Sequence, residues 1–120
     1  MSLILLSALP LTACNREGQH PAQLVGTWVA ERDLGSGDRS VDSLSLRADG
    51  HAELRRLGYH ADTLRSNTHE SAEWHIDSSE DRLSLCLVSP EHRELSICGP
   101  LRVVAADRMQ WGAEYRRAGT

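Results

Sequence analysis

Cys86 and Cys98 are the residues of this chain whose type and spacing best fit a covalent bond between two side chains. Apolar residues alternate along the segments that carry them, as in two paired strands. Matching the apolar positions places Leu87 opposite Ile97, with Leu85 opposite a glycine. The same register places Cys86 directly opposite Cys98. We therefore predict a disulfide, which contributes roughly 3 kcal/mol for a loop of this length; two unpaired thiols are the alternative interpretation.

The remaining polar side chains form no catalytic or metal-binding motif. The six histidines lack the His-x-His and His-x-x-x-His spacings of zinc ligands, and no Cys-x-x-Cys pair accompanies them. His60 and His69, with Asp62 or Glu70, come nearest to a ligand set, but solvated loop side chains explain them better. The chain has no Gly-x-Ser-x-Gly elbow and no glycine-rich phosphate loop. We therefore predict no enzymatic activity, no cofactor and no metal site.

Cys14 lies where a different chemistry is expected. It follows Leu11-Thr12-Ala13, which closes an apolar run from Leu3 to Leu9. A membrane helix needs about 20 apolar residues, whereas the core of a signal peptide needs about 7 to 15, followed by small residues at the cleavage site. The pattern resembles the lipobox of bacterial lipoproteins, in which the cysteine takes a diacylglycerol and becomes the new N-terminus.

The resemblance to a lipobox implies both a location and a domain plan. Residues 1–13 are expected to be a signal peptide, and residues 14–23 a lipidated N-terminus and polar tether. Acyl groups such as palmitate on Cys14 are expected to bind the membrane, and Asn15 resembles outer-membrane sorting signals, so the protein would face the periplasm. In that oxidising compartment Cys86 and Cys98 remain as a pair. The alternative is an ordinary N-terminal core segment that ends in a buried cysteine.

Composition and periodicity predict one β-domain over residues 24–117. The formal net charge is −4, and the chain has no basic block interleaved with aromatic residues, so nucleic acid is not an expected partner. After Leu24 the sequence consists of short alternating runs separated by turn residues. We predict an all-β, antiparallel up-and-down meander of seven or eight strands that closes into a small barrel or half-barrel.

The turn after Leu46 can be derived from the hydrophobic pattern. A two-residue loop would pair Leu46 with Glu53 and bury a carboxylate. A three-residue loop, 48–50 with Gly50 left-handed, pairs Leu46 with Ala52 and keeps apolar residues opposite one another. We expect the second. The segment 58–69 lacks clear alternation and is predicted to be a long loop. The residues expected to face the core are Trp28, Leu44, Leu46, Leu54, Trp74, Ile76, Leu83, Leu85, Leu87, Leu95, Ile97, Trp111 and Tyr115.

Several short motifs resemble the small lipocalin-like domains of bacterial envelope lipoproteins. They are Leu24-Val25-Gly26-Thr27-Trp28 near the domain start, a Leu-Ser-Leu run followed by Asp-Gly, a mid-chain Trp74, and the closing Tyr115-Arg116-Arg117. The resemblance implies a lipocalin-like barrel. It also implies that Gly26 and Trp28 plug one end, with Arg116 or Arg117 stacked on the indole.

Two functions remain open from the sequence. The first is a non-enzymatic, membrane-anchored lipoprotein that binds a small apolar ligand or serves a structural role. A ligand would occupy a shallow pocket near the predicted loop, lined by some of Leu54, Leu57, Tyr59, Leu64 and Trp74. A closed core filled by its own side chains, with no ligand, is the favoured alternative. The second is a periplasmic protein-binding module, such as an inhibitor of a lysozyme or a protease.

Overall fold

The computed structural model describes residues 20–79, 81–92, 94 and 96–119, and this part of the chain is almost entirely β-structure. A short 3₁₀ turn, Ala22–Leu24, precedes the sheet. Among the described residues, no helix is long and apolar enough to cross a membrane. The strands are β1 (Gly26–Gly35), β2 (Asp38–Leu46), β3 (His51–His60), β4 (Thr63–Ser79), β5 (Arg82–Val88), β6 (Ser96–Pro100), β7 (Arg102–Ala105), β8 (Arg108–Gln110) and β9 (Glu114–Arg117).

The described strands form one antiparallel sheet in the order β6-β5-β4-β3-β2-β1-β9-β8-β7. Strands that follow one another in the chain pair with each other, except β6 and β7, which lie at the two edges of the sheet. In addition, β1 pairs with β9. The sheet curls into a nearly closed barrel. Its two edge strands, β6 and β7, follow one another in the chain. The predicted antiparallel meander is therefore confirmed, with nine strands in place of seven or eight.

The turn between β2 and β3 has the predicted register. Leu46 pairs with Ala52, and Leu44 pairs with Leu54. The Arg47 N–H donates to the His51 carbonyl at 2.9 Å, which closes a loop of residues 48–50. Gly50 has φ +94°, as the final residue of such a loop requires. Keeping apolar residues opposite one another was therefore the correct criterion for the turn length.

The predicted disulfide is present. Cys86 pairs with Cys98 across β5 and β6, with Leu85 opposite Gly99 and Leu87 opposite Ile97. Cys86 lies on the face opposite the core, as expected, but it is buried there, beside His75 on β4. The disulfide therefore fixes edge strand β6 to its only neighbour in the sheet.

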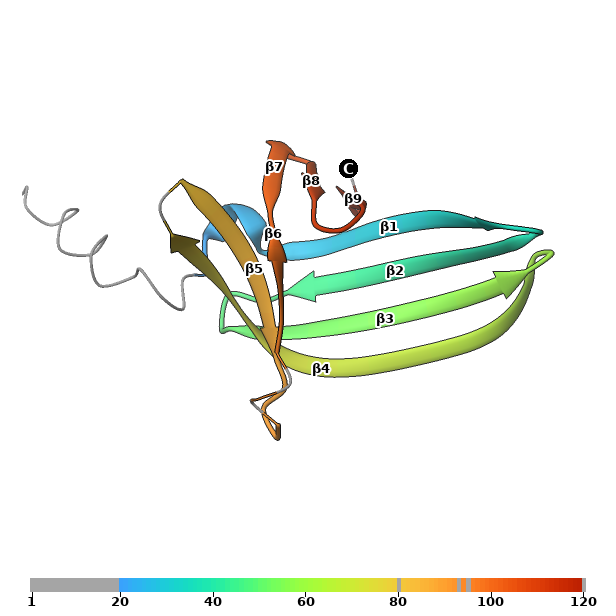
Figure 1. The fold of residues 1–120 in the computed structure, drawn as a ribbon, viewed down its shortest axis with the longest axis horizontal. Coiled ribbons are helices and arrows are strands. Elements are labelled where there is room, and N and C mark those ends of the chain that lie inside the picture. The colour runs from blue at the N-terminus through green and yellow to red at the C-terminus, as the bar shows by residue number, and fades with distance from the viewer. Residues whose placement is uncertain (1–19, 80, 93, 95, 120) are drawn as a thin grey trace, which may run out of the picture.

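The predicted loop at 58–69 is wrong, because this segment is a β-hairpin. Strand β3 continues to His60, Ala61 and Asp62 form a two-residue turn, and β4 begins at Thr63. This hairpin and the β1–β2 hairpin extend together away from β5–β9 (Figure 1). We call this extension, residues 31–41 and 57–68, the arm. Both of its faces meet solvent over most of their area, so no apolar alternation was needed to form it.

The core lies inside the barrel, and most of the predicted core residues contribute to it. Two predictions are wrong in their burial: Leu83 is 42% exposed and Ile97 is 60% exposed. Both face the barrel interior by alternation, but Leu83 lies near the β4–β5 turn and Ile97 lies on an edge strand that no further strand covers. Leu95 lies outside the described residues. The buried core consists of Leu24, Trp28, Ala30, Leu44, Leu46, Ala52, Trp74, Ile76, Leu85, Leu87, Leu101, Met109 and Tyr115.

Candidate ligand groove

An open groove of about 730 Å³ lies on the inner face of the sheet, between β3–β4 and β5–β6. Small-molecule sites typically measure about 300 to 1,000 Å³ and are mostly apolar. The lining residues are Ala52, Leu54, Glu70, Ser71, Ala72, Leu87, Ser89, Pro90, Glu91, Glu94, Ser96 and Ile97. The groove therefore has the size and the apolar floor of a ligand site.

The strand registers bring the floor of the groove together. Ala52 pairs with Ala72 across β3 and β4, and Leu87 pairs with Ile97 across β5 and β6. Leu54 follows Ala52 on the same face, because alternate residues of a strand share a face. The small alanine side chains leave space that larger residues would fill. A concave apolar surface results at the edge of the packed core.

The groove is open because its outer wall is an edge strand. Ile97 projects from β6 without a further strand to cover it, and Leu54 is only partly buried. Trp74 does not line the groove: it is buried, pairs with Leu87, and its indole N–H donates to the Arg47 carbonyl at 2.8 Å. The barrel core is thus filled by side chains, and the groove beside it is open to solvent.

A buried ion-pair cluster lies beside the groove, at the base of the arm. Asp42 on β2 is 0% exposed, and Arg56 on β3 donates from Nε and Nη2 to its two oxygens at 3.0 and 3.2 Å. Arg32 on β1 lies 3.5 Å from the same carboxylate. A buried carboxylate is tolerated only when it is paired and hydrogen-bonded in this way. Arg56 is two residues beyond Leu54 on the same face, so this cluster, Arg32, Asp42 and Arg56, adjoins the groove.

Two pKa shifts follow from this cluster. The hydrogen bonds to Asp42 raise the pKa of the Arg56 guanidinium. Burial raises the pKa of the Tyr115 phenol, and the Asp42 carboxylate raises it further. Arg56 is therefore charged and Tyr115 neutral across the physiological pH range. The cluster acts as a fixed polar boundary between the filled barrel and the arm.

The structure separates the residues predicted to line one pocket. Leu54 lines the groove, whereas Trp74 is buried and pairs with the groove residue Leu87. Leu57 and Tyr59 lie at odd positions of β3 and face the opposite side of the sheet, where Leu64 pairs with Tyr59. There Arg39 lies over the Tyr59 ring, 4.5 Å from its centroid. The groove residues on β5 and β6 were not among those predicted.

The predicted barrel-end residues lie together. The Arg117 guanidinium carbon is 4.2 Å from the centroid of a Trp28 ring, whereas Arg116 is exposed. Arg117 also donates to the Val25 carbonyl at 2.8 Å and fills the space beside Gly26, where a Cβ atom would meet its Nη1. The Trp28 indole N–H donates to the Leu24 carbonyl at 3.0 Å. The Gly-x-Trp segment and the C-terminal arginine thus form one packed unit.

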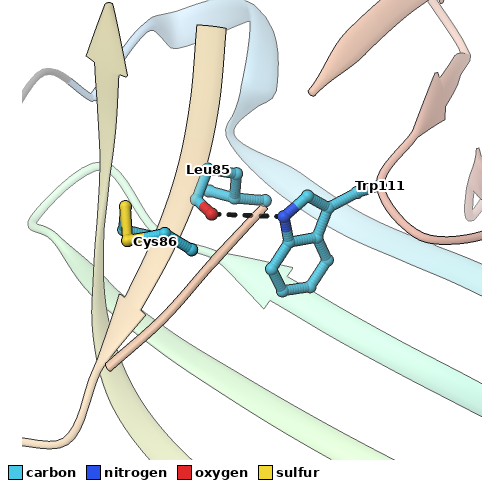
Figure 2. The surroundings of a disulfide bond; sticks show 4 residues. Leu85, Cys86 and Trp111 are labelled. Carbon is cyan, nitrogen blue, oxygen red and sulfur yellow. Dashed lines mark hydrogen bonds between the residues drawn. A yellow bond between two sulfur atoms is a disulfide. The ribbon is translucent and has the colours of Figure 1, made fainter. Parts of the chain in front are cut away.

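The seam between β5–β6 and β7–β9 is bridged by Trp111. Its indole N–H donates to the Leu85 carbonyl at 3.1 Å, next to the disulfide at Cys86 (Figure 2). The ring packs against Gly99, where an added Cβ atom would lie 3.2 Å from Nε1. The Leu101 N–H donates to the Leu83 carbonyl at 2.9 Å. These contacts hold the edge strands together and so keep the groove wall in place.

Cys14, the residue predicted to carry the lipid, lies outside the described residues. The first described residue, His20, packs against the Trp74 ring with centroids 5.0 Å apart, so the chain enters the domain beside Trp74. Within residues 20–119, apart from the three that are not described there, no group of three His, Cys, Asp or Glu side chains is placed to hold a metal ion.

Comparison with known proteins identifies no relative. No family model, curated protein or solved structure matches this chain.

Proposed function

We propose that this chain is a lipid-anchored lipoprotein of the bacterial cell envelope whose β-domain binds a small, largely apolar ligand without catalysis. The observation that supports ligand binding most directly is the open apolar groove beside an otherwise filled barrel. The anchor is supported by the lipobox-like Leu11-Thr12-Ala13-Cys14. Lipid on Cys14 and the polar tether would hold the domain at the membrane surface, with the outer membrane as the expected site.

The anchor predicts how the protein divides between membrane and soluble fractions. Cys14→Ser should abolish incorporation of labelled palmitate and move the protein into the soluble fraction, because about 0.8 kcal/mol per buried methylene is lost with the acyl chains. Asn15→Asp is the matched control, which should keep the label and stay with membranes. The anchor is excluded if wild type takes up no label and Cys14→Ser still sediments with membranes.

The groove predicts saturable binding of a neutral apolar probe. Titration with decyl maltoside, followed by calorimetry, should give a dissociation constant that Leu54→Ser weakens roughly five- to thirtyfold, which corresponds to about 1 to 2 kcal/mol of lost apolar contact. Leu57→Ser is the matched control, because Leu57 is similarly buried on the same strand but faces the other side. Equal effects of the two substitutions would argue against the groove.

A second candidate function, protein binding, is supported by the arm. Its outer face carries apolar side chains that are only partly covered, among them Val41, Leu57, Tyr59 and Leu64. The same titration separates the two functions. Binding that depends on Leu54 supports the ligand groove, whereas no saturable binding leaves the arm as the better-supported site.

A further inference from the structure

We infer that the ligand of the groove carries a positive charge at one end of its apolar body. This inference rests on the proposed ligand-binding function and specifies the chemical class of the ligand. The groove has an apolar floor and three glutamates, Glu70, Glu91 and Glu94, among its lining residues. No Arg, Lys or His is among the described residues that line it. The charge of the rim is therefore complementary to a cation.

The ion-pair cluster beside the groove does not reverse this charge. Its two arginines, Arg32 and Arg56, face the buried Asp42, and Arg56 also interacts with Glu70. Both guanidinium groups lie within ion-pair distance of the buried Asp42 carboxylate. Glu91 and Glu94 are two further carboxylates among the lining residues, and His92 lies 3.7 Å from Glu94. An anionic headgroup would meet carboxylates at the rim, whereas a cationic headgroup would gain an attraction.

The geometry also places the charge and the apolar floor within reach of one small molecule. Glu70 lies directly opposite Leu54 across β3 and β4, so a carboxylate borders the floor itself. Glu91 and Glu94 follow Leu87 beyond the end of β5. A ligand whose apolar chain lies on Leu54, Ala72 and Leu87 would place its headgroup within reach of the glutamates that line the groove. A cationic amphiphile matches this arrangement.

The test compares three probes with the same decyl chain: decyltrimethylammonium, decyl maltoside and decanoate, each below its critical micelle concentration. The protein is the full chain with Cys14→Ser, which removes competing acyl groups. Decyltrimethylammonium should bind roughly three- to tenfold more tightly than decyl maltoside, and decanoate more weakly than either, because exposed ion pairs each contribute modestly. Raising the ionic strength should reduce the difference, since exposed charges are screened.

Substitutions locate the source of the preference. Glu70→Gln with Glu91→Gln should remove most of the preference for the cation, measured as the ratio of the affinities of the same variant for decyltrimethylammonium and decyl maltoside, because both carboxylates line the groove. Glu53→Gln with Glu73→Gln is the matched control. It also removes two negative charges, but from positions on β3 and β4 that face away from the groove. The control should keep the preference.

The outcomes separate this inference from the proposed function. Equal binding of all three probes, lost in Leu54→Ser, would overturn the positive charge and keep the apolar site. A preference that both double variants reduce equally would also overturn it, because net charge alone would then be the cause. Binding of none of the probes would overturn both the inference and the groove.

Discussion

Trp28→Ala is expected to destabilise the domain by about 3 to 5 kcal/mol, which is a large part of the stability of a small domain. Trp28 is 1% exposed at the centre of the core. Its loss would leave a cavity, remove the ring on which Arg117 stacks, and leave the Leu24 carbonyl without the indole donor. Urea unfolding followed by circular dichroism measures the change.

Trp28→Phe is the matched variant for this prediction. It keeps an aromatic ring beneath Arg117 but loses the indole hydrogen bond, so its cost should be clearly smaller than that of the alanine variant. An alanine variant that loses less than about 1 kcal/mol would contradict the role given to Trp28, since burial of this side chain would then contribute little.

Removal of the disulfide is expected to have the next largest effect. The double variant Cys86→Ser with Cys98→Ser should lose about 3 kcal/mol of unfolding free energy, because the unfolded chain gains the entropy of an open loop. The loss should also loosen β6, which has only β5 as a neighbour and carries Ile97 at the groove wall.

Reductant provides the control for the disulfide. Wild type in dithiothreitol should approach the stability of the double variant, and the variant should not respond to dithiothreitol. If the double variant is as stable as the oxidised wild type, the disulfide does not contribute as proposed.

The ion-pair cluster beside the groove can be derived from the strand register of β2 and β3. The three-residue loop that pairs Leu44 with Leu54 also pairs Asp42 with Arg56, two residues further along each strand. Extending that register would have predicted a buried carboxylate beside a guanidinium. The apolar alternation ends before Asp42 and Arg56, so the apolar pattern alone does not predict the polar cluster.

The arm was missed for a different physical reason. Strand prediction relies on one buried and one solvated face, whereas most of the arm is exposed on both. Its turn is formed by Ala61 and Asp62 and so lacks the usual Asn-Gly signal. These two residues have φ of +49° and +67°, values that glycine and asparagine adopt more easily. Pairing there depends on the backbone and on tip contacts such as the Ala61 N–H donating to the Gly37 carbonyl at 2.9 Å.

The groove could not be derived from periodicity, which predicts the face of a residue but not what covers that face. Ile97 was correctly placed on the inner side of β6, yet it remains exposed because β6 is an edge strand. Which strands lie at the edges depends on how the barrel closes, and that closure depends on contacts distant in sequence, such as the hydrogen bond from Trp111 to Leu85.

Ligand binding in the groove is tested most directly by a nuclear magnetic resonance titration of the full chain carrying Cys14→Ser with decyltrimethylammonium. We expect saturable amide shifts centred on Leu54, Ala72, Leu87 and Ile97, with little change at Leu57, Tyr59 and Leu64 on the opposite face. Shifts centred on the outer face of the arm, or no saturable shifts at the four groove residues, would contradict it.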